Sequence, residues 1–145
     1  MSLFEQQEEI VEVLKNVSRS ALVYEGQLHD GTEWVVDIGD GTAPVLGIEF
    51  GGTTDIPNSQ KGIIGAAHNG QEAIFSVIAV GTSKYDCRAI MQNVRDDMVG
   101  FTPTNASEIK PALYASIGAI NDITSPTRYA DIQTFTFISN SDKSC

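Results

Sequence analysis

The sequence predicts an α+β fold, with a mixed or antiparallel sheet of several short strands packed by an N-terminal helix and a central amphipathic helix. Three observations support this class. A helical apolar pattern covers Leu3–Val17, a strand pattern runs into a second helical pattern across Gln71–Phe101, and a strand pattern covers Tyr129–Ser139. The 145 residues, 41% of them apolar, suit a single domain, 1–145, in which Asn140–Cys145 is expected to be a polar, mobile tail.

The first helix is expected at Leu3–Val17. Ser2 with Glu5 three residues later forms a capping box at its start. Lys15 and Arg19 suit the negative end of the helix dipole. One face of this helix carries the apolar side chains Leu3, Ile10, Leu14 and Val17.

Short strands follow the first helix. They are expected at Ala21–Glu25, Glu33–Ile38 and Val45–Phe50, with glycine-rich turns between them. The composition of Gly51–Gln60 predicts a loop. Lys61–Ala67 and Gln71–Val80 are expected to pair as a hairpin around His68-Asn69-Gly70, because Asn-Gly supplies the positive φ of a type I′ turn.

The second helix is expected at Lys84–Val99. Ser83 stands at the N-cap with Asp86 at the reciprocal position, and Gly100 stands where the chain leaves the helix. The residues at helical spacing that should face the core are Cys87, Ile90, Met91, Val94 and Met98. This helix therefore presents one apolar face to the sheet.

The rest of the chain is expected to alternate between loops and short elements. Thr102–Lys110 reads as a loop, and Pro111 could begin a short helix at Pro111–Ile117. Gly118–Thr127 reads as a second loop. Tyr129–Ser139, rich in Thr, Phe and Ile, should complete the sheet as its last strand.

Composition limits the functional classes. A net charge of −10 argues against binding to a nucleic-acid backbone, which requires a basic surface. Two cysteines, Cys87 and Cys145, provide neither a metal site nor a disulfide framework, and they suggest a reducing, cytosolic compartment. The start of the chain does not resemble a signal peptide, and no apolar run reaches the length of a membrane span. No metal or cofactor is expected.

Two glycine-rich motifs are better explained as turns. Asp37-Ile-Gly-Asp-Gly-Thr42 resembles a phosphate loop of actin-like ATPases, but those folds need a second domain for which the chain has no room. Gly47 with Gly51-Gly52 lacks the Lys-Ser/Thr of a P-loop. Neither motif predicts nucleotide binding.

Catalysis would need a nucleophile beside a base. The candidates are Cys87, the His29-Asp30 pair and His68. Cys87 is expected to face the core, and both histidines neighbour turn glycines. We therefore expect a protein that is not an enzyme, with a small hydrolase as the least favoured alternative.

The order and length of the elements resemble those of the tail terminator (tail completion) proteins of long-tailed bacteriophages. Three segments carry the resemblance: an N-terminal helix at Phe4–Leu14, a strand leading into an amphipathic helix at Ala73–Phe101, and a late strand at Tyr129–Phe137. The central helix ends in Val-Gly-Phe, as the family's helix ends in a hydrophobic-Gly-aromatic stop. The long Gly51–Gln60 loop and the weak early strands depart from the family.

The resemblance implies a structural virion protein of the tail or neck, assembled in the host cytoplasm. Such a protein forms a ring, usually of six copies, on the head-proximal end of the tail tube. There it stops tube polymerisation and presents a surface to the head–tail connector or stopper protein. The partners implied are further copies, the tail tube protein and the connector. DNA would pass through an acidic lumen without specific binding, and no membrane is involved.

The departures leave open a neck adaptor or head–tail connector as the alternative. In either role, loops on a rigid scaffold are expected to carry recognition. The residues expected to contact partners are Thr53, Thr54, Asp55, Ile56, His68, Asn69, Gly70, Thr104 and Asn105.

Overall fold

The computed structural model describes residues 3–17, 22–30, 33–39, 43–55, 70–123 and 128–140, with the backbone alone for 52–55 and 113–123. In chain order the elements are α1 (Leu3–Lys15), β1 (Leu22–Glu25), β2 (Val45–Asp55), β3 (Gln71–Gly81), α3 (Lys84–Met98), β4 (Lys110–Ile123) and β5 (Arg128–Ser139). The strands form one sheet in the order β1-β2-β3-β5-β4. β1 is parallel to β2, and every other neighbouring pair is antiparallel. The predicted α+β class is confirmed.

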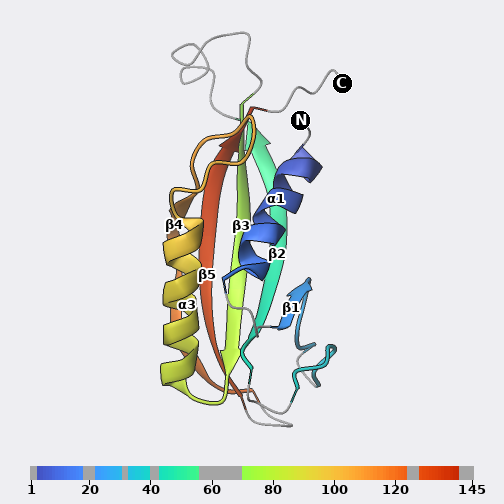
Figure 1. The fold of residues 1–145 in the computed structure, drawn as a ribbon, viewed down its shortest axis with the longest axis vertical. Coiled ribbons are helices and arrows are strands. Elements are labelled where there is room, and N and C mark those ends of the chain that lie inside the picture. The colour runs from blue at the N-terminus through green and yellow to red at the C-terminus, as the bar shows by residue number, and fades with distance from the viewer. Residues whose placement is uncertain are drawn as a thin grey trace.

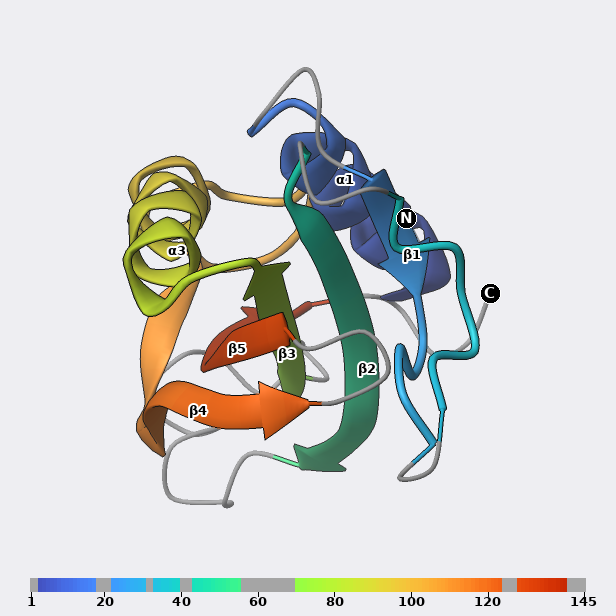
Figure 2. The same cartoon turned by 90° about the horizontal axis from the view of Figure 1, so that it is seen from below.

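Both helices cover the same face of the sheet (Figures 1 and 2). α1 lies over the β2 side and α3 lies over β5 and β4. The two helices also contact each other, so they form a continuous layer over the sheet. Helices on one face of a largely antiparallel sheet are the arrangement expected from the sequence.

The main core fills the space between the helices and the sheet. Ile10 and Leu14 of α1, Val94 and Met98 of α3, and Phe75 of β3 are completely buried there. Each side chain of this kind contributes about 1.5–3 kcal/mol when it leaves water. The core therefore fixes the position of both helices on the sheet.

A smaller core lies on the opposite face of the sheet. The segment between β1 and β2 folds across that face and buries Leu28 against Val45, Val80 and Ala130. Trp34, the only tryptophan of the chain, packs at its edge. The sheet is consequently covered on both faces near the start of β2.

Both predicted helices are confirmed. Ser83 Oγ accepts a hydrogen bond from the Asp86 amide at 3.1 Å, which caps α3 at its first turn. Gly100 adopts φ +91°, a left-handed conformation that glycine takes without a steric penalty, directly after the C-cap residue Val99. Ser2 and Arg19, expected to stabilise the ends of the first helix, lie outside the described residues.

The predicted strands at Ala21–Glu25 and Tyr129–Ser139 are confirmed as β1 and β5, but the predicted hairpin is wrong. Lys61–Ala67 lies outside the described residues, but the other strand of the predicted hairpin, Gln71–Val80, has both of its edges occupied by β2 and β5. β2 pairs with one edge of β3 from Gln71 to Val80. β5 pairs with the opposite edge from Gln71 to Gly81. The local Asn-Gly turn signal gave no information about this long-range pairing.

The strand predicted at Glu33–Ile38 is also wrong. Asp30 Oδ1 accepts a hydrogen bond from the Glu33 amide at 2.8 Å, and the Val35 amide donates to the Leu28 carbonyl at 2.9 Å. These bonds reverse the chain so that the segment folds back on itself and does not join the sheet. Its apolar side chains, including Trp34, pack in the smaller core instead.

The short helix predicted at Pro111–Ile117 and part of the loop predicted at Gly118–Thr127 are replaced by β4, which runs to Ile123. β4 is an edge strand that pairs only with β5 within the described chain. Proline is tolerated near the start of an edge strand because its missing N–H need not serve a second neighbour. The proline signal for a helix start was therefore ambiguous.

The strand predicted at Val45–Phe50 is confirmed but is longer than expected. β2 continues through Gly51 and Gly52 to Asp55, so the first half of the predicted Gly51–Gln60 loop is strand. The pairing register with β3 shifts between Phe50 and Thr53, which marks a β-bulge at the two glycines. The glycines interrupt the register without ending the strand.

We expect Gly47→Ala to destabilise the fold because side chains of the smaller core approach the backbone of β2 closely there. An added Cβ would lie 2.9 Å from Ile78 Cγ2 and 2.9 Å from Leu28 Cγ. Overpacking of this kind costs about 1–3 kcal/mol of unfolding free energy. Urea unfolding followed by the fluorescence of Trp34 measures the cost.

The matched control is Gly51→Ala, whose Cβ would meet its nearest atom, the Ile74 carbonyl oxygen, at 3.4 Å. This variant should lose less than about 0.5 kcal/mol, since replacing a strand glycine also reduces the entropy of the unfolded chain. Equal losses in the two variants would contradict the packing described for Gly47.

Candidate functional site

Several chain segments meet at one end of the sheet, the upper end in Figure 1. Asp55, the last residue of β2, pairs with Gln71 at the start of β3, and Gln71 pairs with Ser139 at the end of β5. Ala106, in the loop between α3 and β4, forms an isolated bridge with Ser139. We call the region formed by the backbone of 53–55 and the loop 102–107 the end surface.

The end surface contains most of the residues predicted to contact partners. Thr53, Thr54 and Asp55 form the last part of β2, and Thr104 and Asn105 lie in the connecting loop. The sequence had placed them on separate loops, and the structure brings them together. Gly70, directly before β3, lies at the same end but is buried, so it is not available for the predicted contact. The remaining predicted residues, Ile56, His68 and Asn69, lie outside the described part of the chain.

The loop of the end surface is held by two side chains of α1. Gln6 Nε2 donates hydrogen bonds to the carbonyls of Thr104 at 2.8 Å and Asn105 at 3.0 Å, and Gln6 Oε1 accepts one from Ser139 Oγ at 2.6 Å. Glu9 accepts hydrogen bonds from the amide and the hydroxyl of Thr104, both at 2.8 Å. These contacts fix the loop against α1 and β5.

The backbone of the loop supports the same geometry. Asn105 has φ 59°, a left-handed conformation that asparagine tolerates better than most residues. Its carbonyl also accepts a hydrogen bond from the Asn140 amide at 2.9 Å. Pro103 and Ile109 are buried beneath the loop, while the side chains of Thr104 and Asn105 are exposed. The loop is therefore a defined surface that offers polar side chains to solvent.

Sequence reasoning missed Gln6. It is completely buried, although glutamine is usually exposed. Its position was a usable signal, because it lies between Leu3 and Ile10 at helical spacing on the apolar face of the helix. A buried amide in such a stripe needs hydrogen-bond partners for both its NH₂ group and its carbonyl oxygen. The partners of Gln6 lie about 100 or more residues away in the sequence.

Cys87 has the environment of an inert core thiol. It is fully buried, and its Sγ–H donates to the Tyr129 carbonyl at 3.0 Å. Burial raises the pKa of the thiol from about 9 to about 11, and the nearby carboxylates of Asp131 and Asp86 act in the same direction. A reactive cysteine requires the opposite shift. The prediction that Cys87 faces the core is confirmed.

Cys87 and His29, the candidate nucleophile and base among the described residues, are not brought together. His29 lies on the opposite face of the sheet, edge-on to Trp34 with ring centroids 5.0 Å apart, beside Ile78 and Ile132. Asp30, its neighbour in sequence, uses its carboxylate to accept the Glu33 amide in a turn. Cys87 and His29 therefore cannot act as a nucleophile and its base.

Asp37 also has a local structural role. Its Oδ1 accepts a hydrogen bond from the Gly39 amide at 2.9 Å, and Gly39 has φ 70°. This geometry is that of a turn stabilised by an aspartate side chain, as expected for this motif. The last part of the motif, 40–42, lies outside the described residues.

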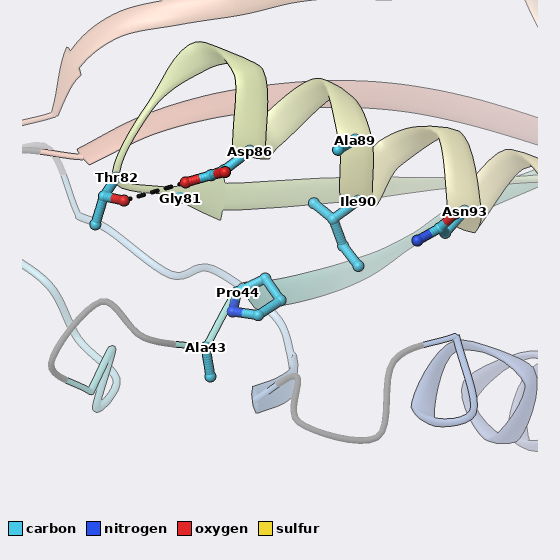
Figure 3. Close-up of a pocket in the computed structure, with 8 residues that line it drawn as sticks. All are labelled: Ala43, Pro44, Gly81, Thr82, Asp86, Ala89, Ile90 and Asn93. Atoms are coloured by element: carbon cyan, nitrogen blue, oxygen red, sulfur yellow. Dashed lines mark hydrogen bonds between the residues drawn. The ribbon is translucent and has the colours of Figure 1, made fainter.

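A cavity of about 280 Å³ lies at the other end of the sheet, where the connection from β3 to α3 approaches the start of β2 (Figure 3). Ile90 points toward Pro44, while Thr82 Oγ1 donates to Asp86 Oδ2 at 3.2 Å. Among the described residues of its lining, Asp86 is the only one with a titratable side chain. The described lining residues therefore provide no acid–base pair.

Across the described ranges, no group of three His, Cys, Asp or Glu side chains could hold a metal ion. None of the helices in the same ranges is both long and apolar enough to cross a bilayer. The sequence matches no model of a known protein family and no curated protein.

We expect Gln6→Ala to destabilise the fold and to loosen the loop of the end surface. The substitution leaves the partly buried Thr104 and Asn105 carbonyls and the buried Ser139 hydroxyl without the Gln6 amide, at a cost of about 1–3 kcal/mol. Urea unfolding gives the loss in stability, and amide hydrogen exchange across 101–107 reports the loop.

Gln92→Ala is the matched control for Gln6→Ala. Gln92 is also helical, but it is exposed and makes its hydrogen bond to Asp96 at the surface of α3. Its loss should lie within about 0.5 kcal/mol of zero. Similar losses in both variants, with unchanged exchange in 101–107, would rule out the clamping role of Gln6.

We expect the Cys87 thiol of the folded protein to resist thiol reagents. We also expect its ionisation to lower the free energy of unfolding at high pH. In a Cys145→Ser background, Ellman's reagent at pH 8 should react with Cys87 only after unfolding. Because the folded pKa of about 11 exceeds the unfolded value of about 9, only the unfolded thiol ionises between these values. Proton release therefore favours unfolding, and stability should decrease as the pH rises from 9 to 11.

Cys87→Ala isolates this effect, since it removes the thiol and leaves the other titrating groups. The decrease between pH 9 and 11 should be smaller in Cys87→Ala than in the Cys145→Ser protein. Cys87→Ser should mainly lower stability, because it places a hydroxyl in the core. Rapid labelling of folded Cys87 at pH 8 would show that the thiol is accessible and reactive.

Proposed function

We propose that this protein is a structural subunit of a phage virion, a tail terminator that forms a ring on the head-proximal end of the tail tube. In this role it stops tube polymerisation and provides the surface to which the head attaches. The proposal starts from the resemblance in element order. The structural observation that supports it best is the convergence of Thr53–Asp55 and 102–107 on one end of the sheet.

A terminator must present a defined surface to a tube end that is itself rigid. The end surface suits that task because Gln6 and Glu9 hold its loop by hydrogen bonds to α1. A loop ordered in advance loses less entropy on binding than a loop that folds on contact. Thr104 and Asn105 offer exposed polar side chains on that ordered loop.

The charge of the chain is compatible with a ring around DNA. Six copies at −10 each would carry roughly −60 in total. Carboxylates lining a lumen repel the phosphate backbone, so DNA would slide through without adhering. The acidic composition therefore favours passage of DNA over its capture.

We propose that the protein acts through contacts and not through catalysis. The best candidate nucleophile, Cys87, is a buried thiol with a raised pKa. The best candidate base, His29, lies on the other face of the sheet. These two observations argue against a small hydrolase that would use Cys87 and His29.

Electron microscopy of tails from a phage that lacks this gene tests the proposal. We expect overlong tails, because tube polymerisation would continue without its terminator. Tails of normal length that are detached from heads would instead identify a neck adaptor. Normal tails joined to heads would contradict both roles.

Complementation with two variants tests the end surface itself. Thr104 and Thr82 are both exposed threonines whose hydroxyl donates to a carboxylate, at opposite ends of the molecule. Thr104→Arg should fail to restore tail length because it adds a bulky cation to the proposed contact surface. Thr82→Arg should restore tail length as the native gene does.

Sizing chromatography with mass photometry, at low and high concentration, complements the microscopy. A ring-forming subunit should self-associate alone or on isolated tail tubes. A chain that stays monomeric in solution and also fails to form rings on tubes would contradict the terminator role.

A further inference from the structure

The outer edge of β2 is open over half of its length. β1 pairs only with Val45–Ile48, and its pairing ends where the Gly26 amide donates to the Ile48 carbonyl at 2.8 Å. β2 then continues from Glu49 to Asp55 and pairs with β3 on its inner side alone, among the described residues. The outward backbone groups of this stretch form a template for another strand.

A groove of about 530 Å³ lies beside this open edge, between α1 and the end of β1. Phe4 of α1 stands at the groove with 67% of its surface exposed, close to Phe50 of β2. The charged residues in the described lining of the groove are all carboxylates: Glu8, Glu25 and Glu49. The edge therefore combines unpaired backbone, exposed aromatic surface and negative charge.

The opposite edge of the sheet has the complementary character. β4 has a neighbour only on its β5 side in the described chain, so its outer edge is also open. Lys110 begins β4 and is exposed, and α3 lies alongside. The helical positions of Lys84, Arg88 and Arg95 place them on one flank of α3, and Arg88 and Arg95 both act electrostatically on Asp131 of β5.

Some carboxylates also lie near this second edge. Glu108 is 4.0 Å from Lys110 and Asp131 is partly buried beneath α3. Asp96 accepts a hydrogen bond from Gln92 on the surface of α3. Even so, the exposed flank of α3 and the start of β4 carry cations, whereas the described lining of the groove contains none.

We propose that the β4 edge of one copy docks on the Glu49–Asp55 edge of a second copy and extends the sheet from subunit to subunit. The basic flank of α3 and Lys110 would then face the acidic groove. The occupant is a second copy because the complementary strand edge and the complementary charge are both present on the same chain.

Strand directions support this pairing. β2 is antiparallel to β3, β3 to β5 and β5 to β4, so β2 and β4 run in opposite directions. Two copies in the same orientation would therefore join as an antiparallel pair, the more stable arrangement. Both helices lie on one face, so α3 of one copy would lie beside α1 of the next.

The contact uses two different surfaces and is therefore head-to-tail, which produces a ring when the rotation closes. Copies in the same orientation would also present every end surface on the same side of that ring. The biological role of this interface rests on the proposed terminator function, but the interface itself is tested without a phage.

Charge reversal tests the interface in mass photometry or analytical ultracentrifugation. Glu25→Lys/Glu49→Lys reverses the groove, and Lys84→Glu/Lys110→Glu reverses the flank. Each double variant should raise the dissociation constant for self-association at least about tenfold. An equimolar mixture of the two should recover association, because each reversed edge then meets an edge of opposite charge.

Glu12→Lys/Asp97→Lys is the control, since it changes the net charge as the groove variant does but at exposed helix positions outside the groove lining. It should change the dissociation constant less than about threefold. Hydrogen exchange should slow at 49–55 and 110–123 when the native chain associates. Circular dichroism confirms that each variant is folded.

The outcomes separate the interface from the function. A native chain that is monomeric at all concentrations, or whose association survives both reversals, overturns the interface. Rings on tail tubes that persist in both variants overturn the interface and support the terminator role. Association that follows the charge pattern, together with normal tails in the deletion phage, supports the interface and overturns the terminator role.

Discussion

β3 is the element on which the rest of the structure depends, because it pairs with β2 along one edge and with β5 along the other. That double pairing places Phe75 at the centre of the sheet. Its ring is stacked on Phe135 at 5.3 Å and contacts Phe50 at 5.8 Å and Phe137 at 6.2 Å. Aromatic clusters of this size bury large areas, so they hold the three strands together beneath the two helices.

The pairing of β3 also determines where the interaction surfaces lie. Its first residue, Gln71, is in register with Asp55 and Ser139, so the end of β2, the start of β3 and the end of β5 must meet. Gln6 then ties α1 and the 102–107 loop to the same place. A polar network that is fully satisfied in this way specifies one arrangement, since any shift would leave buried groups unpaired.

The same topology separates two kinds of surface. The ends of the strands carry the end surface and, opposite to it, a recess beside α3. The lateral edges carry the open part of β2 with its acidic groove and the open side of β4 with its cations. A subunit of a ring needs both kinds, because lateral edges join copies while ends meet other components.

Local patterns in the sequence determined both helices, the strands at β1, β3 and β5, and the core position of Cys87. These features depend on capping residues and apolar periodicity, which act over a few residues. The sequence also named Thr104 and Asn105 as loop residues. It did not reveal that Gln6 holds their carbonyls, because those partners are nearly 100 residues away.

Only the tertiary structure decided which strands pair. The Asn-Gly signal predicted a hairpin with β3, but β2 pairs with that edge of β3 instead. Pro111 predicted the start of a helix, but it lies in the edge strand β4, which pairs with β5. Strand pairing depends on hydrogen bonds and side-chain contacts between distant segments, so a local pattern cannot select among the available partners. The physical reason is that a helix satisfies its backbone within itself, whereas a strand requires a neighbour that the fold must supply.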